Sequence, residues 1–226
     1  NFKEPFQKLL TQGMVIKDGS KMSKSKGNVV SPEEIISKDG ADTARLFILL
    51  AALPERGLAW SDQGVEGAFR FLNRVWRIVG DFADKVAAGT NGIDTEKLTK
   101  EEKDLRRILH VTIKKVTEDI GERYTFNTAI SSIMELVNAF YNFKENPEAL
   151  QDGVAREVVL SLLKLLAPFA PHMTEELWTK LVGEGSIHKS SWPQAEAAAM
   201  VQEEVELVLQ INGKVRDKLT VPSEIT

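Results

Sequence analysis

The feature that most limits the fold is a series of apolar residues repeated at three- and four-residue spacing between residues 65 and 181. That spacing places apolar side chains on one face of an α-helix. The members of the repeats are Val65, Phe69, Leu72, Trp76, Val79 and Val86; Leu105, Ile108, Leu109, Val116 and Ile120; Phe126, Ile130, Ile133, Met134, Val137 and Tyr141; Val158, Leu162, Leu163 and Leu166; and Leu177, Trp178 and Leu181. The repeats predict four or five amphipathic helices that pack as an antiparallel bundle, with Trp76 and Trp178 in its core.

Several residues mark the expected ends of these helices. A capping box is predicted at Ser31 with Glu34, just before a short helix, and a second at Thr99 with Glu102. Proline suits the first helical turn, so Pro171 is expected to open the last helix, with His172 as a structural residue at its start. A linker is expected over about residues 183–203, because no apolar period continues there.

Two short strands are expected near the C-terminus, where apolar residues alternate on both sides of Asn212-Gly213. A two-residue loop would pair Leu209 with Arg216. A three-residue loop pairs Leu209 with Val215 and Val205 with Leu219, which aligns the apolar faces, so we expect that register. It would place three basic side chains on the opposite face: Lys214, Arg216 and Lys218.

Composition narrows the class of protein. The 226 residues are 42% hydrophobic and 27% charged, as in globular proteins, and no apolar run reaches membrane-spanning length. Cysteine is absent, which excludes disulfides and thiolate metal sites, and no metal site is predicted; we expect a cytoplasmic protein. The net charge of −4 lacks the basic character of many nucleic-acid-binding domains. The chain starts at Asn1 and ends soon after a strand, so we interpret it as an excised piece.

The strongest chemical signal is a polar loop that follows a strand at residues 12–17 and a turn at Asp18-Gly19. The loop is Lys21, Met22, Ser23, Lys24 and Ser25. Lysine ammonium groups bind phosphate oxygens, serine hydroxyls and free backbone amides add donors, and Gly27 lets the chain bend. A loop of this composition can also be an ordinary solvated surface, but five specified positions in order are far rarer than a lone glycine-rich motif.

The ordered string resembles the signature of class I aminoacyl-tRNA synthetases, and its flanks are similar to the leucyl-tRNA synthetases. Similar phrases follow in the expected order along nearly the whole chain: KMSKSKGNVV from Lys21, GADTAR from Gly40, WSD from Trp60, RFLNRVW from Arg70, PFAPH from Pro168, EELW from Glu175, Trp192-Pro193 and QINGKVR from Gln210. Valyl and isoleucyl relatives more often carry leucine at the position of Lys26.

This resemblance implies activation of leucine by ATP, with Mg²⁺, and transfer to the 2′-hydroxyl of the terminal adenosine of tRNA(Leu). Lys24 would contact the ATP phosphates and stabilise charge as the leucine carboxylate attacks, with Lys21 assisting. The family's second ATP motif, His-x-Gly-His, does not occur here, and the leucine pocket would lie outside this piece. We therefore expect the piece alone to be inactive.

The resemblance also implies three parts: residues 1–62 as the end of a catalytic domain with stem-contact helices, 63–188 as an anticodon-binding-type helical bundle, and 189–226 as a linker and the start of a C-terminal tRNA-binding domain. Arg70, Arg74 and Arg77 lie on one helix face and are candidate tRNA contacts, or simply a solvated face. Lys214, Arg216 and Lys218 are candidates too, or a basic strand edge that discourages aggregation.

The expected fold is mainly α: a loop-bearing segment, then an antiparallel helical bundle, then a short β-hairpin. Two alternatives stay open. One is a valyl, isoleucyl or methionyl synthetase, since the amino-acid pocket is not in this sequence. The other is a non-catalytic tRNA-binding module.

Overall fold

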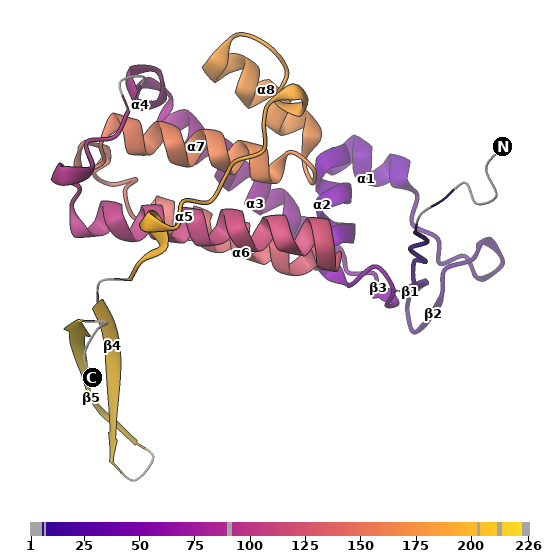
Figure 1. Ribbon diagram of the computed structural model, residues 1–226. Coiled ribbons are helices and arrows are strands. Elements are labelled where there is room, and N and C mark those ends of the chain that lie inside the picture. Colours follow the sequence, from indigo (N-terminus) through magenta and orange to yellow (C-terminus); the bar gives the residue numbers. More distant parts are fainter. Residues whose placement is uncertain (1–5, 7, 90–91, 203, 212–213, 223–226) are drawn as a thin grey trace.

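A computed structural model describes residues 6, 8–89, 92–202, 204–211 and 214–222. The fold is mainly α, as expected, with a small sheet near the N-terminus and a helical body beside it (Figure 1). The α-helices are α1 (Pro32–Asp39), α2 (Ala41–Ala51), α3 (Asp62–Asp81), α4 (Ala83–Ala88), α5 (Lys100–Glu118), α6 (Phe126–Tyr141), α7 (Asp152–Leu166) and α8 (Pro171–Val182).

The N-terminal sheet has the strand order β2-β1-β3. Strand β1 (Val15–Lys17) pairs antiparallel with β2 (Ser20–Lys21) and parallel with β3 (Leu58–Ala59), so a strand within residues 12–17 is confirmed. Asp18 and Gly19 form the connecting turn with φ of 52° and 71°. Two positive φ values match the twist of a two-residue hairpin, and this turn places Lys21 at the start of the loop.

The predicted capping box forms at α5, whereas α1 is capped by a different bond from the one predicted. The capping box at α5 is confirmed: Thr99 Oγ1 accepts from the N–H of Glu102, and the Glu102 carboxylate accepts from the N–H of Thr99. At α1, Ser31 Oγ accepts from the N–H of Glu33, one residue before the position that a capping box with Glu34 requires. Both helices nevertheless begin where the sequence predicts, since either hydroxyl satisfies a free N–H of the first turn.

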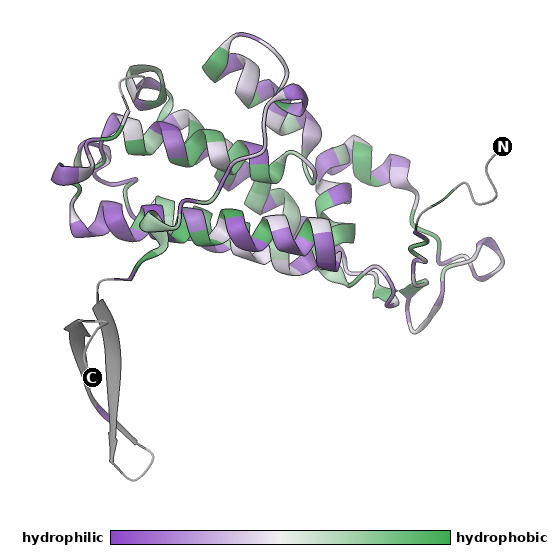
Figure 2. Ribbon diagram, viewed as in Figure 1, coloured by the Kyte–Doolittle hydropathy of each residue, from purple (hydrophilic) through white to green (hydrophobic). Residues whose placement is uncertain are grey.

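The hydrophobic core runs between α2, α3, α5, α6, α7 and α8. Figure 2 shows hydrophobic and hydrophilic residues mixed along each of the long helices, as one-faced burial requires. The fully or nearly fully buried members that fill the centre include Leu46, Val75, Ile78, Phe82, Leu109, Ile113, Ile133, Phe140, Leu162 and Phe169. Trp178 is also buried, as expected.

The expected core face of α3 is partly wrong. Phe69 and Trp76 are 40% and 38% exposed, whereas Ala68, Phe71 and Val75 are buried. The apolar residues of this helix form one broad arc, and Phe69 and Trp76 lie at its edge, while the arc's centre packs against the bundle. Lys180 of α8 lies 4.6 Å from the centre of the Trp76 ring, a cation–π contact at the surface. The helix also ends before Val86, because Phe82 separates α3 from α4.

The segment expected as a linker packs against the bundle over much of its length. Ile187, in the 3₁₀ turn η6 (Ile187–Lys189), is buried. Trp192 Nε1 donates to Thr117 Oγ1 of α5 at 2.8 Å. The N–H of Glu196 donates to His110 Nδ1 at 3.2 Å. The absence of an apolar period here reflected irregular backbone, and did not mean absence of contacts.

Strands β4 (Glu204–Ile211) and β5 (Lys214–Pro222) pair antiparallel in a register that differs from the expected one. Ile211 pairs with Lys214, and a register shift between Leu209 and Gln210 brings Leu209 opposite Asp217. A β-bulge of this kind realigns a ladder without lengthening its loop. The predicted pairing of Leu209 with Val215 is therefore wrong, and residues 212 and 213 lie outside the described residues.

None of the helices in the described part of the chain has the combination of length and apolar character needed to span a lipid bilayer.

Candidate functional site

The polar loop continues directly from the short hairpin. Lys21 ends β2, and the N–H of Met22 still bonds to the carbonyl oxygen of Val15, at 3.0 Å. Residues Lys24–Lys26 then form the 3₁₀ turn η1. Gly27 closes this turn at a φ of 66°, a conformation that favours glycine, and its N–H donates to the carbonyl of Lys24 at 3.2 Å. The backbone of the loop is thus held at both ends.

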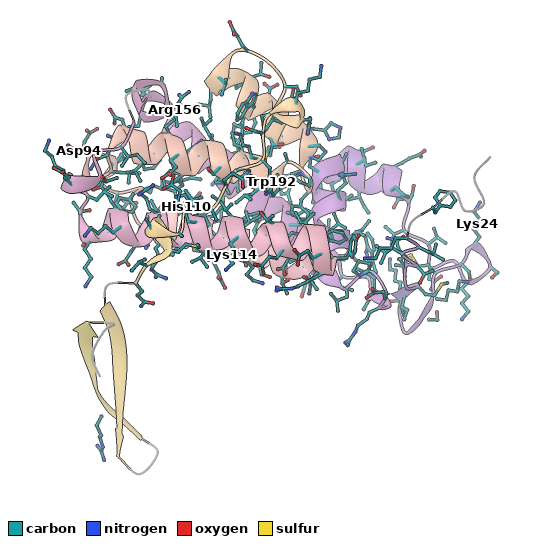
Figure 3. All side chains as sticks on the ribbon, viewed as in Figure 1. Lys24, Asp94, His110, Lys114, Arg156 and Trp192 are labelled. Carbon is teal, nitrogen blue, oxygen red and sulfur yellow. The ribbon has the colours of Figure 1, made fainter. Side chains whose placement is uncertain are left out.

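The side chains of the loop point their charges into solvent. Lys21, Lys24 and Ser25 are exposed, while Met22 and Ser23 are half-buried. Ser23 Oγ and Ser25 Oγ lie 3.1 Å apart, within hydrogen-bonding distance. Within the part of the chain that the structure describes, no ion pair joins Lys21 or Lys24 to an acidic side chain. Both ammonium groups are therefore free to meet an anionic ligand. Figure 3 shows Lys24 at one end of the molecule, far from Asp94 at the other.

Asn28 is a residue that the sequence reasoning missed. Its Oδ1 accepts from the N–H of Ser23 at 2.9 Å. Its Nδ2 lies 3.2 Å from the carbonyl oxygen of Lys17 and 3.3 Å from that of Lys21. The only signal in the sequence is its place right after Gly27 in the KMSKSKGN string, and nothing in that string shows that its amide turns back onto the hairpin.

The three arginines of α3 have different surroundings. Arg77 is exposed and has no ion-pair partner among the described residues. Arg70 is exposed and lies 3.7 Å from Glu66. Arg74 is partly buried: its guanidinium donates to Asn138 Oδ1 at 2.9 Å and lies 4.6 Å from the Tyr141 ring centre. The structure therefore leaves Arg70 and Arg77 available at the surface and uses Arg74 to join α3 to α6.

Lys214, Arg216 and Lys218 all belong to β5, and Arg216 is exposed. In the ladder, Lys214 pairs with Ile211 and Lys218 pairs with Val208. The expected common face of the three basic side chains stays a prediction.

One cluster of titratable groups lies on the bundle, at a distance from the loop along the chain. Arg106 donates to both carboxylate oxygens of Glu157, at 2.7 and 3.0 Å, and to Glu196 at 3.1 Å. His110 Nε2 lies 3.2 Å from Glu157. Burial alone would raise the pKa of Glu157, but the hydrogen bonds from His110 and Arg106 and the Arg106 charge lower it to about 2. Although His110, Glu157 and Glu196 are near enough to share an ion, the guanidinium already bridges the carboxylates.

Three cavities, of about 410, 650 and 370 Å³, lie among α4, α5, α6 and α7 and their connections. The loop of residues 21–25 lines none of these three.

Comparisons with known proteins agree with this layout. Residues 1–61 match the family described as tRNA synthetases class I (I, L, M and V), and residues 102–226 match the anticodon-binding domain of tRNA ligase. A leucine–tRNA ligase from Geobacter sp. (strain M21) is 56% identical over 223 residues, which cover 98% of this chain and 27% of that relative.

A solved structure is similar over the full length of the chain. It is the crystal structure of the ternary complex of Agrobacterium radiobacter K84 agnB2 LeuRS-tRNA-LeuAMS, with a TM-score of 0.83 and 33% identity, covering 100% of this chain and 28% of that one. The chain therefore spans a little over a quarter of the relatives it matches. From the two family matches and the leucyl relatives, we conclude that this chain belongs to the tRNA ligase family, as a class I leucyl-tRNA synthetase segment followed by an anticodon-binding domain.

Proposed function

We propose that this chain works within a leucine–tRNA ligase, where it supplies the loop that binds the ATP phosphates and surfaces that bind tRNA(Leu). The reaction is the activation of leucine by ATP, followed by transfer of the leucyl group to the terminal adenosine of the tRNA. The observation that carries the proposal is the loop at residues 21–25, which presents Lys21 and Lys24 exposed and without acidic partners in the described residues. The 56% identity to a leucine–tRNA ligase supports leucine as the substrate.

The proposed role of Lys24 is electrostatic. As the leucine carboxylate attacks the α-phosphate, negative charge moves onto the phosphate oxygens and the departing pyrophosphate. An ammonium group held near these oxygens stabilises that charge, and phosphoryl chemistry needs mainly positioning and charge of this kind. Lys21 adds a second charge on the same loop, while Ser23, Ser25 and the backbone around Met22 offer hydrogen-bond donors.

ATP normally reaches such a site with Mg²⁺, which neutralises phosphate charge. The residues described here do not fit a resident Mg²⁺ site. The cluster of His110, Glu157 and Glu196 is bridged by Arg106 and lies on the bundle, apart from the loop in sequence. The chain's own contribution is therefore lysine charge, with the ion arriving on the nucleotide.

We further propose the division of labour along the chain. Residues 1–62 form the end of the catalytic domain, residues 63–188 the anticodon-binding-type bundle, and residues 189–226 the linker and the start of a C-terminal tRNA-binding domain. Arg70 and Arg77 are the better tRNA candidates on α3, because Arg74 is engaged with Asn138. Arg216, exposed on β5, is a further candidate together with Lys214 and Lys218.

Two other functions compete. A valyl, isoleucyl or methionyl ligase would share the class I segment, since that family description covers I, L, M and V; the leucyl relatives argue against it. A non-catalytic tRNA-binding module would share the bundle, but would have no need for a phosphate loop. Because the His-x-Gly-His motif does not occur in this sequence, the chain alone should not activate leucine.

The test is leucine-dependent ATP–pyrophosphate exchange by the full-length enzyme that carries this chain. Lys24→Ala should slow exchange by about 10²–10³-fold, the usual effect of losing one transition-state donor, with the KM for leucine nearly unchanged. Lys26→Ala, a neighbouring exposed lysine outside the proposed site, is the matched control and should slow it far less. Near-normal exchange in Lys24→Ala would reject the proposed role of the loop, and exchange driven by another amino acid would reject leucine.

A further inference from the structure

Asn28 joins three segments around the loop through a single carboxamide. Its Oδ1 accepts from the N–H of Ser23 in the loop. Its Nδ2 lies within 3.2–3.3 Å of the carbonyl of Lys17 on β1, the Oγ of Ser20 and the carbonyl of Lys21 on β2. An asparagine amide has one acceptor oxygen and two N–H donors, and here both kinds of group are used.

These contacts hold the backbone on both sides of Met22. The carbonyl of Lys21 lies just before this residue, and the N–H of Ser23 lies just after it. Beyond Ser23, the turn η1 is closed by the N–H of Lys26, which donates to the carbonyl of Ser23 at 3.2 Å. Restraint of Ser23 by Asn28 is therefore passed to the turn that begins at Lys24.

The path of the chain explains how Asn28 reaches this position. Gly27, in the left-handed conformation, ends η1 and turns the chain back toward the hairpin. Asn28 is half-buried there, whereas Lys24 stays exposed. The loop is thus tied at its base while its charged tip remains open, an arrangement that reduces the ordering needed when a ligand binds.

We propose that Asn28 is a positioning residue, whose carboxamide holds the loop so that the Lys24 ammonium lies where the phosphates of ATP bind. This inference rests on the proposed function, since it assumes that Lys24 acts on ATP. The contacts require a side chain that accepts one hydrogen bond and donates others, as the asparagine carboxamide does. Aspartate would keep the acceptor for Ser23 but would turn an oxygen toward the carbonyls of Lys17 and Lys21, and alanine would lose every bond.

The experiment is a double-mutant cycle in the full-length enzyme, with ATP–pyrophosphate exchange measured without tRNA and rates expressed per leucine-binding site. Asn28→Ala should lower kcat at least about tenfold and raise the KM for ATP, with the KM for leucine within about twofold. Asn28→Asp should be impaired at least as much. In the Lys24→Ala background, Asn28→Ala should lower kcat by less than about threefold. A residue that acts only by positioning the Lys24 ammonium has little further effect once that group is gone.

Asn73→Ala is the matched control, since the Asn73 amide donates to the carbonyl of Phe69 on α3, outside the loop. It should leave the exchange rate unchanged, and thermal melting of each variant separates loss of folding from loss of positioning. Normal exchange in Asn28→Ala, or an equal loss with and without Lys24, would overturn this inference while the proposed function stands. Normal exchange in Lys24→Ala would instead overturn the proposed function, and this inference with it.

Discussion

Asp42 of α2 caps the start of α8 by bonding to both His172 and Met173. Asp42 Oδ1 accepts from His172 Nδ1 at 2.8 Å, and Asp42 Oδ2 accepts from the N–H of Met173 at 2.7 Å. Asp42 is only 8% exposed, and Ala170, at the N-cap position of α8, has no side chain able to cap it. A carboxylate at a helix N-terminus satisfies free N–H groups and favours the helix dipole, so a residue 130 positions away completes this helix.

The same contact joins α2 to α8. Helix α2 follows the loop-bearing segment and α1, while α8 closes the bundle. Arg45, one turn along α2, donates to the carbonyl of Pro168 at 3.1 Å beside it. His172 is thus at a helix start, as the sequence predicted, and its contact with Asp42 brings the GADTAR and PFAPH segments together.

Replacing this cap should destabilise the chain. Asp42→Ala should lower the free energy of unfolding by about 1–2 kcal/mol, because it leaves the first N–H groups of α8 without their acceptor. Urea denaturation followed by circular dichroism measures it. Asp84→Ala, an exposed carboxylate in the first turn of α4, is the control and should cost clearly less. Equal losses in the two variants would contradict the capping role.

The Glu157 cluster predicts a dependence of stability on pH. Against the opposing effect of burial, His110 and Arg106 lower the pKa of Glu157 from 4.5 to about 2 in the folded chain. The unfolded chain then takes up a proton first as the pH falls. The stabilisation is complete above about pH 4.5 and is lost between pH 4.5 and 2, with a total of roughly 3 kcal/mol.

Urea titrations at pH 5, 4 and 3 should show this loss in the native sequence. Glu157→Gln should be less stable at neutral pH, because Arg106 loses its bidentate charged partner and keeps only Glu196, and its stability should change less across the same range. Glu145→Gln, at an exposed carboxylate in the turn after α6, should keep the native slope. If Glu157→Gln kept that slope too, another carboxylate would be responsible.

The arginines of α3 should differ in their contribution to tRNA binding. Arg77→Ala should make the plot of log K against log salt concentration shallower by about 0.7–0.9, the value for one lost phosphate contact. Arg70→Ala should have a smaller effect, since Glu66 already neutralises part of its charge. Arg74→Ala should leave the slope unchanged and lower stability, because its guanidinium bonds to Asn138. The measurement is binding of leucine tRNA at several KCl concentrations. The largest slope change in Arg74→Ala would contradict this order.

Local signals in the sequence were enough for the helices and for the loop. The repeats at 105–120 and 126–141 correspond to α5 and α6, and the capping box at Thr99 formed as expected, because caps and amphipathic periods act over a few neighbouring residues. The ordered string at residues 21–25 identified the class of protein for the same reason, since its meaning lies in adjacent residues.

Contacts between segments far apart in the sequence could not be predicted from these local signals. Phe69 and Trp76 have the right spacing for a core and lie at the surface, because they sit at the edge of the apolar arc of α3 and the helices packed against α3 cover only its centre. The segment expected as a linker packs on α5 through Trp192 and Glu196. The register of β4 and β5 depended on a bulge, which adds no recognisable residue to the sequence.

By itself, then, the sequence determined the helical fold class, the helix starts and the family to which the loop belongs. Only the tertiary structure decided which arginine of α3 stays free, which carboxylate caps α8, and that Asn28 ties the loop to its hairpin. The physical reason is how far apart along the chain the interacting residues lie. Period and capping are set by backbone geometry within a turn or two of helix, whereas the hydrogen bond from the Met173 N–H to Asp42 exists only after the intervening chain has packed.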